Sequence, residues 1–321
     1  MSEAVVEYTR GGIVESLHRV RVAVVEGKKR RLAAGDVAEP VFMRSSAKPF
    51  QALAVVESGA ADAYGLTAEE LALVCGSHPA DEMHVRAAAS ILAKAGVEAS
   101  ALQCGAHPPL SSKALKELYR AGGEPTALHN NCSGKHAGML AAAKKMGAPL
   151  ESYLDPAHPL QKANRAAVAR WCGVKSVRLG IDGCSAPNFA LPLEAMARGM
   201  AAYATAEGAP RRLREAMMAH PVMVGRPCVQ VMSAAPGRVI AKAGAEGVYL
   251  VGMPASAVGI ALKGLDGASR PLLHVLAVVV RKLRLLPKAD VAALAKLAEP
   301  VLKNHAGLSV GSVNVRIRFG R

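Results

Sequence analysis

The sequence contains few aromatic residues: Phe, Trp and Tyr make up 3% of its 321 residues, with a single Trp. Hydrophobic residues nevertheless account for 51%, so a sizeable core is expected and global disorder is excluded. Such a core must be built from Ala, Val, Leu and Met. Asn and Gln are also scarce, at ten residues in all, a shortage that is typical of thermophilic proteins.

Signals for secretion and for membrane insertion are lacking too. Residues 1–10 contain two Glu and no long apolar core, which does not fit a signal peptide. The most apolar stretch, 272–286, is too short for a membrane span and contains one His and three Lys or Arg residues. Six cysteines in such a chain are expected to be reduced thiols. We therefore expect a cytoplasmic protein that does not enter a membrane.

Acidic residues are outnumbered, with 25 Asp or Glu against 40 Lys or Arg, which gives a net charge of +15. That balance can attract nucleic acid, anionic membranes or acidic small molecules. The basic residues are scattered, however, and their one tight cluster, Lys28–Arg31, lies between two apolar runs, as in a hairpin turn. No aromatic residues interleave with it to stack on bases. A basic nucleic-acid-binding protein remains an alternative, but we expect no nucleic-acid partner.

The periodicity of hydrophobic residues changes along the chain. Alternating or β-rich runs predict strands at 4–8, 20–25, 31–34, 41–43, 177–181, 238–241, 247–251, 257–262 and 312–318. Helical spacing predicts helices at 47–58, 81–95, 112–121, 133–146, 159–171, 191–203, 210–220, 271–286 and 288–298, and Thr67 is predicted to cap a further helix.

Strands therefore lie at both ends of the chain, and helices lie between them. This order favours an α+β fold in which N- and C-terminal strands join in one antiparallel sheet flanked by helices. We expect one functional unit over 1–321, with a sheet-containing part at 1–60 plus 225–321 and a mainly helical part at 61–224.

The first candidate for chemistry is the pair Ser45 and Lys48, which form Ser-x-x-Lys. Residues three apart on a helix share a face, so the hydroxyl and the amine can meet. A lysine acts as a base when burial or neighbouring cations lower its pKa. Because the chain has 19 serines, about one such motif is expected by chance, so the pair alone does not identify a catalytic site.

Two further segments carry residues of the same chemistry. Lys242-Ala243-Gly244 follows a predicted strand and is similar to the Lys-Thr-Gly motif of penicillin-recognising enzymes. Ser77, in Cys75-Gly76-Ser77-His78, is a second serine that could relay protons. Alternatively, Lys242 is a surface lysine on a strand edge, and the Cys75–His78 segment is a helix C-cap followed by a turn.

Cysteines and a histidine gather around a third predicted helix start. Cys132 and His136 are four residues apart, and Cys184 follows a predicted strand end. Bare chemistry suggests a zinc site made of these three residues, with buried structural cysteines as the alternative. Asp182, two residues before Cys184, could hold a substrate ammonium group.

Together these segments resemble the class 3 L-asparaginases, a zinc-associated family whose fold is similar to serine β-lactamases and glutaminases. The matching segments, in family order, are Arg44–Pro49, Gly76–His78, Asn131–Met139, Asp182–Pro187, Lys242–Gly247, and Ala261–Lys263 with Asp266–Gly267. Many motifs in one order are more specific than any single one.

The resemblance implies hydrolysis of L-asparagine through an acyl-enzyme. It implies Ser45 as nucleophile, Lys48 as its base, and Ser77 as a second catalytic serine paired with Lys242. A glutaminase or a β-lactamase-like serine amidase is the closest alternative activity.

The resemblance also implies a metal, a substrate-binding set and an assembly. Zinc is implied to be bound by Cys132, Lys135 and Cys184, with Lys135 in place of the His136 that spacing suggested. The implied substrate-binding residues are Arg44, Asp182, His136 and Cys228. A homodimer is implied as well.

The chain departs from the family pattern at two places near the implied site. Pro79-Ala80 stands where a Ser-Gly-like pair is expected, and the segment around Gly225-Arg226 is compressed. These departures bear on substrate preference more than on reaction class.

Overall fold

A computed structural model describes residues 3–319, and the chain divides into two compact units. Unit 1 contains the described parts of Met1–Val41, Leu191–Thr205 and Gln230–Arg321. Unit 2 contains Phe42–Ala190 and Ala206–Val229. The chain therefore passes between the units at 41/42, 190/191, 205/206 and 229/230, whereas we expected a mainly helical part that runs without interruption over 61–224.

Unit 1 is built on one antiparallel sheet. Its strands are β1 (Glu3–Arg10), β2 (Ile13–Glu26), β3 (Lys29–Ala34), β7 (Ile240–Gly244), β8 (Val248–Met253), β9 (Val258–Gly264), β10 (Val301–Lys303) and β11 (Ser309–Arg318). Their order is β10-β11-β1-β2-β9-β8-β7, with β3 paired to β2.

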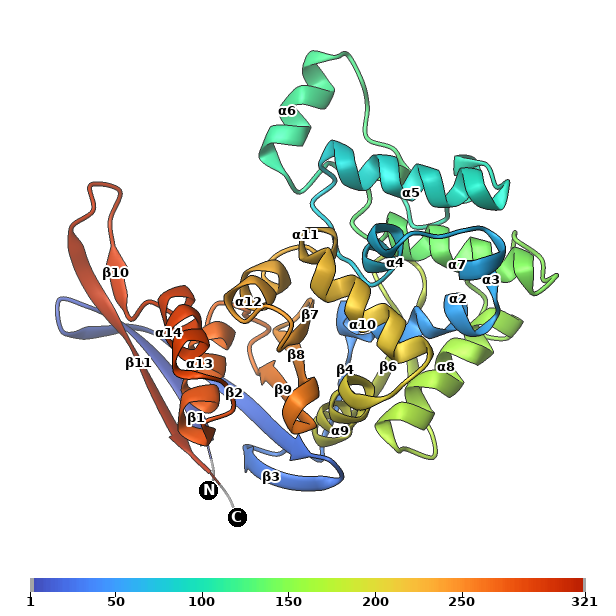
Figure 1. The fold of residues 1–321 in the computed structure, drawn as a ribbon. Coiled ribbons are helices and arrows are strands. Elements are labelled where there is room, and N and C mark those ends of the chain that lie inside the picture. The colour runs from blue at the N-terminus through green and yellow to red at the C-terminus, as the bar shows by residue number, and fades with distance from the viewer. Residues whose placement is uncertain (1–2, 320–321) are drawn as a thin grey trace. The chain divides into compact units, whose positions relative to one another are not determined.

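The two ends of the chain meet in this sheet. Strand β1 pairs antiparallel with β11, from Glu3 opposite Arg318 to Arg10 opposite Gly311. Figure 1 shows the first strand in blue beside the last in red. The predicted α+β class, with N- and C-terminal strands in one antiparallel sheet, is confirmed.

Helices cover both faces of this sheet. Helix α9 (Leu193–Thr205) packs so closely on one face that a Cβ added at Gly259 would lie 1.9 Å from the carbonyl oxygen of Ala197. Tyr8 points to the other face, where its ring contacts His274 of α13 (Leu272–Leu283), which packs against α14 (Lys288–Leu297). Alternate residues of the strands therefore face different helices.

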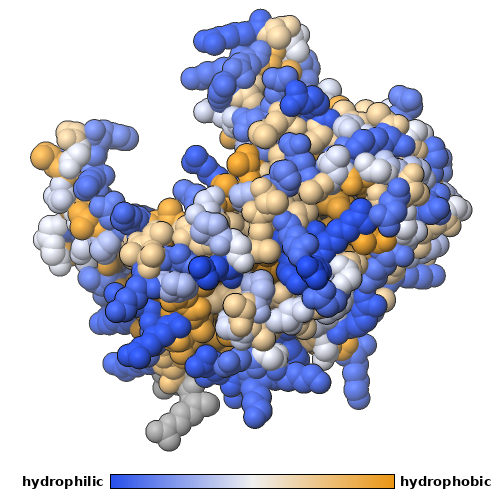
Figure 2. All heavy atoms as spheres, viewed as in Figure 1, coloured by the Kyte–Doolittle hydropathy of each residue, from blue (hydrophilic) through white to orange (hydrophobic). Residues whose placement is uncertain are grey.

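The basic cluster Lys28–Arg31 lies in the hairpin between β2 and β3, and its residues are exposed. On the face drawn in Figure 2, hydrophilic and hydrophobic residues are interspersed. Among the helices of residues 3–319, none is both long and apolar enough to span a membrane.

Unit 2 is mainly helical. Its helices are η1 (Arg44–Ala47), α1 (Lys48–Gln51), α2 (Leu53–Glu57), α3 (Ala60–Ala63), α4 (Ala68–Val74), α5 (Glu82–Ala95), η2 (Ala99–Ala101), α6 (Ser112–Arg120), η3 (Ala127–His129), α7 (Ser133–Lys145), α8 (Pro159–Cys172), α10 (Ala209–Ala219) and α11 (Pro221–Val224). Strand β5 (Arg178–Ile181) pairs with β6 (Pro187–Pro192) in a small sheet that also contains β4 (Pro40–Phe42), and α12 (Cys228–Ala234) begins at the end of the unit.

Helix α7 forms the core of unit 2, where it packs against α2, α4, α5 and α8 (Figure 1). Every residue from Ser133 to Ala143 is buried. Two glycines permit this packing: a Cβ at Gly134 would lie 2.5 Å from Leu73 Cγ, and one at Gly138 would lie 2.7 Å from Val74 Cγ2. The buried first turn of α7 carries several of the predicted site residues.

Some local predictions need correction. The helix predicted over 47–58 is divided into η1, α1 and α2. A 3₁₀ turn precedes Lys48, and the α-helix is interrupted at Ala52. The first half of β2, from Ile13, and the short strands β6 and β10 were not predicted. Thr67 does cap α4, and it forms a reciprocal capping box with Glu70.

Candidate active site

Ser45 and Lys48 lie one turn of 3₁₀ helix apart. The backbone N–H of Lys48 donates to the carbonyl of Ser45, which closes the turn η1. Side chains three apart in a 3₁₀ turn eclipse each other, so the two functional groups leave the backbone on the same side. Ser45 is half-buried and Lys48 is buried, at 1% exposure. The neighbouring Ser46 hydroxyl donates to the Met43 carbonyl at 2.6 Å and is therefore structural.

The Lys48 amine contacts the second predicted serine. Its Nζ donates to Ser77 Oγ at 3.0 Å, to the Asn131 carbonyl at 3.3 Å and to the Gly76 carbonyl. These three acceptors match the three N–H donors of an ammonium group. The structure thus brings Lys48 and Ser77 together from segments 29 residues apart, while the 3₁₀ turn links Lys48 to Ser45.

Arg44 and Asp182 form an ion pair at the edge of this site. Arg44 Nε donates to Asp182 Oδ1 at 2.7 Å, and the Arg44 backbone N–H donates to Asn188 Oδ1 at 3.0 Å. Arg44 has a φ of +51°, a left-handed conformation that strains a residue with a side chain by about 1–3 kcal/mol. The loop carrying Asp182 therefore holds the residue directly before Ser45 in a fixed, strained conformation.

Two thiols and an amine converge behind the serines. Lys135 Nζ donates to Cys184 Sγ at 3.1 Å, and the thiols of Cys132 and Cys184 are hydrogen-bonded to each other. Cys132 directly precedes α7, Lys135 lies in its first turn, and Cys184 lies in the loop between β5 and β6. All three are buried.

The pKa values of the two thiols in this cluster shift in opposite directions. The hydrogen bond with Cys184, helped by nearby Lys48 and Lys135, lowers the pKa of the Cys132 thiol well below its ordinary value despite burial. The same hydrogen bond and burial raise the pKa of Cys184. Burial favours a neutral Lys135 amine, but the two thiols outweigh burial and raise the Lys135 pKa.

His136 does not join the two cysteines. Its Nδ1 lies 2.6 Å from the Tyr153 hydroxyl, and its ring is fully buried. Burial, with Lys135 and Lys48 nearby, lowers the pKa of His136 well below its ordinary value, so the ring is neutral. Among residues 3–319, no three His, Cys, Asp or Glu side chains gather where they could hold a metal, so the ligand set with His136 is not formed. Its substrate-binding role stays a prediction.

Lys242 and Cys228 are the remaining predicted site residues. Lys242 lies on β7 of unit 1, where it is buried and donates to the Ala243 carbonyl at 2.8 Å. Cys228 is buried at the start of α12. Lys242 and Ser77 belong to different units, so their pairing stays a prediction, as does the role of Cys228.

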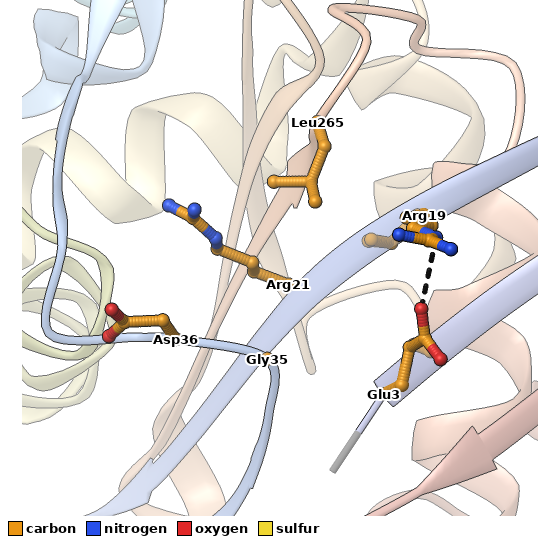
Figure 3. A pocket seen from close by; sticks show the side chains of 8 residues that line it. Glu3, Arg19, Arg21, Gly35, Asp36 and Leu265 are labelled. Carbon is orange, nitrogen blue, oxygen red and sulfur yellow. Dashed lines mark ion pairs between the residues drawn. The ribbon is translucent and has the colours of Figure 1, made fainter. Parts of the chain in front are cut away.

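Two hollows differ in their relation to the site. A cavity of about 460 Å³ in unit 2 has Ser77 in its wall, together with Asp81, Lys113 and Arg226. A hollow of about 350 Å³ in unit 1 is lined by Arg19, Arg21 and Glu3 among others (Figure 3). In the second hollow the cations are already paired, since Arg19 binds Glu3 at 3.1 Å and Arg21 binds Glu39. Only the first hollow contacts a predicted catalytic residue.

Sequence reasoning missed several groups that shape the site. The carbonyls of Gly76 and Asn131 hold Lys48, and the Asn188 amide holds the backbone of Arg44. Backbone carbonyls carry no residue signature, so the sequence could not identify the first two. Asn188 directly follows the Asp182–Pro187 segment and is one of only ten amide side chains, which is the signal that could have found it.

Comparison with known proteins gives a family. The sequence profile of the L-asparaginase II family matches residues 6–315, nearly the whole chain. No curated protein matches the sequence.

Several solved structures are similar in backbone arrangement. Mglu in its native form in 4.3 M NaCl has a TM-score of 0.46 at 16% identity, over 83% of this chain and 61% of that one. Mglu in its tris and glutamate form has a TM-score of 0.47 at 15% identity, over 83% and 59%. A β-lactamase from Burkholderia ambifaria has a TM-score of 0.39 at 17% identity, over 87% and 91%. The chain spans about three-fifths of the length of Mglu in these first two structures.

The family match covers every segment that carries a predicted site residue, from Arg44 to Lys242. This protein belongs to the L-asparaginase II family.

Proposed function

We propose that this protein is an L-asparaginase that hydrolyses L-asparagine to L-aspartate and ammonia through an acyl-enzyme on Ser45. The observation that carries the proposal is the buried Lys48 amine, which lies one 3₁₀ turn after Ser45 and 3.0 Å from Ser77 Oγ. A buried lysine shared by two serines is an arrangement that can activate one hydroxyl and move protons through the other.

The reaction begins when a neutral Lys48 accepts the proton of the Ser45 hydroxyl. Ser45 Oγ forms a bond to the side-chain amide carbon of asparagine, and the C–N bond then breaks. Ammonia leaves with a proton that Lys48 returns, directly or through Ser77, whose Oγ it contacts at 3.0 Å. Water then attacks the β-aspartyl ester and Lys48 accepts a proton from it. The ester bond breaks, Lys48 returns that proton to Ser45 Oγ, and L-aspartate leaves.

The neutral state of Lys48 is the demanding requirement. The Lys48 amine is buried and donates hydrogen bonds to Ser77 Oγ and to the carbonyls of Gly76 and Asn131. We propose that Lys242 supplies a cation to this site, as the family resemblance implies.

We also propose that Cys132, Lys135 and Cys184 bind Zn²⁺. The donor set fits, since two thiols and an amine converge in a buried place, and zinc prefers sulfur and nitrogen ligands with one position left open in functional sites. Zinc binds thiolates and a neutral amine, so binding must release the protons that these three groups carry. When bound, the ion would supply a positive charge that orients a polar substrate.

The test of the activity is ammonia release from L-asparagine by the wild type and by Ser45→Ala. The variant is expected to lose on the order of 10⁴-fold or more in kcat, because the nucleophile is removed. Ser46→Ala is the matched control, since the Ser46 hydroxyl binds the Met43 carbonyl instead. L-glutamine and the β-lactam nitrocefin, tested in parallel, would expose a glutaminase or β-lactamase activity. Near wild-type ammonia release by Ser45→Ala would refute the scheme.

The assembly is an expectation that follows from the resemblance. We propose a homodimer, which light scattering coupled to gel filtration would detect. A salt-dependent gel shift with nucleic acid would instead favour the basic-binder alternative.

A further inference from the structure

The cavity beside Ser77 carries positive charge that lacks a partner. Arg226 lines it, is exposed, and has no ion-pair partner within residues 3–319. Lys113, in the first turn of α6, also lines it, with 82% of its side chain exposed and only a 3.8 Å contact to Glu117. At that exposure such a contact neutralises little charge. Two cations are thus available to an anionic group in the cavity.

The same wall carries a carboxylate with unused acceptors. Asp81 is the N-cap residue of α5, a position where Asp normally accepts a backbone N–H, but its side chain makes no capping hydrogen bond. Its one ionic contact is with His84 Nδ1 at 3.9 Å, and that buried nitrogen has no hydrogen-bond partner within residues 3–319. Asp81 is therefore free to accept hydrogen bonds from a ligand.

The predicted substrate-binding residues Arg44 and Asp182 differ from the residues of this wall, because they are paired with each other. Arg44 and Asp182 bind each other at 2.7 Å, so each already satisfies the charge of the other. Asp81 and Arg226, by comparison, present opposite charges to one cavity of about 460 Å³. Ser77, which lies in the same wall, connects this cavity to Lys48.

We propose that this cavity binds the zwitterionic end of an α-amino acid substrate, with Arg226 and Lys113 on its α-carboxylate and Asp81 on its α-ammonium. This inference rests on the proposed amidohydrolase function and adds the selection of free amino acids over blocked ones.

The carboxylate half is tested with L-asparagine and its α-methyl ester, whose carboxylate is masked. Arg226→Ala is expected to lower kcat/KM for L-asparagine by about ten- to a hundredfold, mainly through KM, because a charge-assisted hydrogen bond is lost. For the ester, which cannot form that bond, the same substitution should lower kcat/KM little. Arg226→Lys keeps the positive charge, so it should retain part of the preference for L-asparagine over its α-methyl ester.

The ammonium half is tested with succinamic acid, which is asparagine without its α-amino group. Asp81→Asn is expected to weaken use of L-asparagine and to leave use of succinamic acid nearly unchanged. Lys116→Ala is the matched control for both halves, because Lys116 is exposed on α6 and lies outside the cavity wall. Thermal unfolding of each variant checks that it folds.

Equal losses of kcat/KM on the blocked and free substrates would overturn the subsite. If the wild type released no ammonia, the proposed activity would fail by itself, and the subsite would be judged by calorimetric binding of L-aspartate. Binding by the wild type that weakens at least tenfold in Arg226→Ala but not in Lys116→Ala would support the subsite. Absence of L-aspartate binding, or equal binding by both variants, would overturn it.

Discussion

At the scale of single residues, the position of Lys48 explains the site best. The Ser-x-x-Lys spacing predicted that Ser45 and Lys48 share a side of their helix, and the 3₁₀ turn has that geometry. The spacing could not predict that the amine donates to Ser77 and to two backbone carbonyls, because those acceptors come from distant loops. The residue types were therefore predictable, whereas the atoms that meet depend on the folded loops.

The buried cluster leads to a prediction about metal content. Cys184→Ala removes one sulfur of the proposed zinc set and the hydrogen-bond partner of Cys132. The variant should retain less than about a tenth of the zinc of the wild type after dialysis, measured by elemental analysis, because a structural or catalytic site rarely survives loss of a ligand. Cys172→Ala, on α8, is the control for removing a buried cysteine. Equal zinc in both variants would exclude Cys184 as a ligand.

Glu70 provides a prediction about pH. Burial raises its pKa, but hydrogen bonds from Lys94, the Thr67 backbone and Ser90 outweigh burial, so its pKa is lowered. A carboxylate whose pKa falls on folding stabilises the folded state above its unfolded pKa of about 4.3, and this contribution disappears as the pH falls through the folded value.

Glu70→Gln should therefore lower the free energy of unfolding by about 1–3 kcal/mol at pH 7. The difference from the wild type should narrow as the pH falls below about 4. Urea unfolding at several pH values measures both quantities. A difference that stays constant down to pH 3 would show that the Glu70 charge does not stabilise the fold.

At the scale of elements, helix α7 places the cluster residues. Its helical spacing predicted 133–146, and the observed helix is Ser133–Lys145. The small residues that permit its close packing were visible in the sequence, but their contacts were not, because contacts between helices depend on the fold. The division of the predicted 47–58 helix into η1, α1 and α2 was missed as well, because the helical spacing of the sequence does not mark it.

Gly134 tests how tightly α7 packs on α4. In Gly134→Ala, the new Cβ would lie 2.5 Å from Leu73 Cγ and 2.9 Å from the Leu73 carbonyl oxygen, and backbone yields little. Overpacking should lower the free energy of unfolding by about 1–3 kcal/mol, which exceeds the gain in helix propensity of up to about 1 kcal/mol. The urea midpoint of Gly134→Ala should therefore lie below that of the wild type.

Gly183→Ala makes the same chemical change where no atom lies within 4 Å of the added Cβ, so it is the control. Equal urea midpoints for the two variants would show that α7 and α4 can separate without cost.

At the scale of the whole molecule, the order of strands and helices was predictable because hydrophobic periodicity is local. Strands at both chain ends imply one sheet, and β1 does pair with β11. The placement of α9 on that sheet was not predictable, because a helix drawn from the middle of the chain carries no mark of the unit it joins. The same holds for Lys242, whose motif gives its residue type but not its partner.

The central claim is that Ser45, and not Ser77, carries the acyl group. The most direct measurement is to mix the enzyme with L-asparagine, quench with acid within the first turnover, digest, and locate any aspartyl adduct by mass spectrometry. We predict an aspartyl ester on the peptide containing Ser45. An adduct on the peptide containing Ser77 would contradict the account.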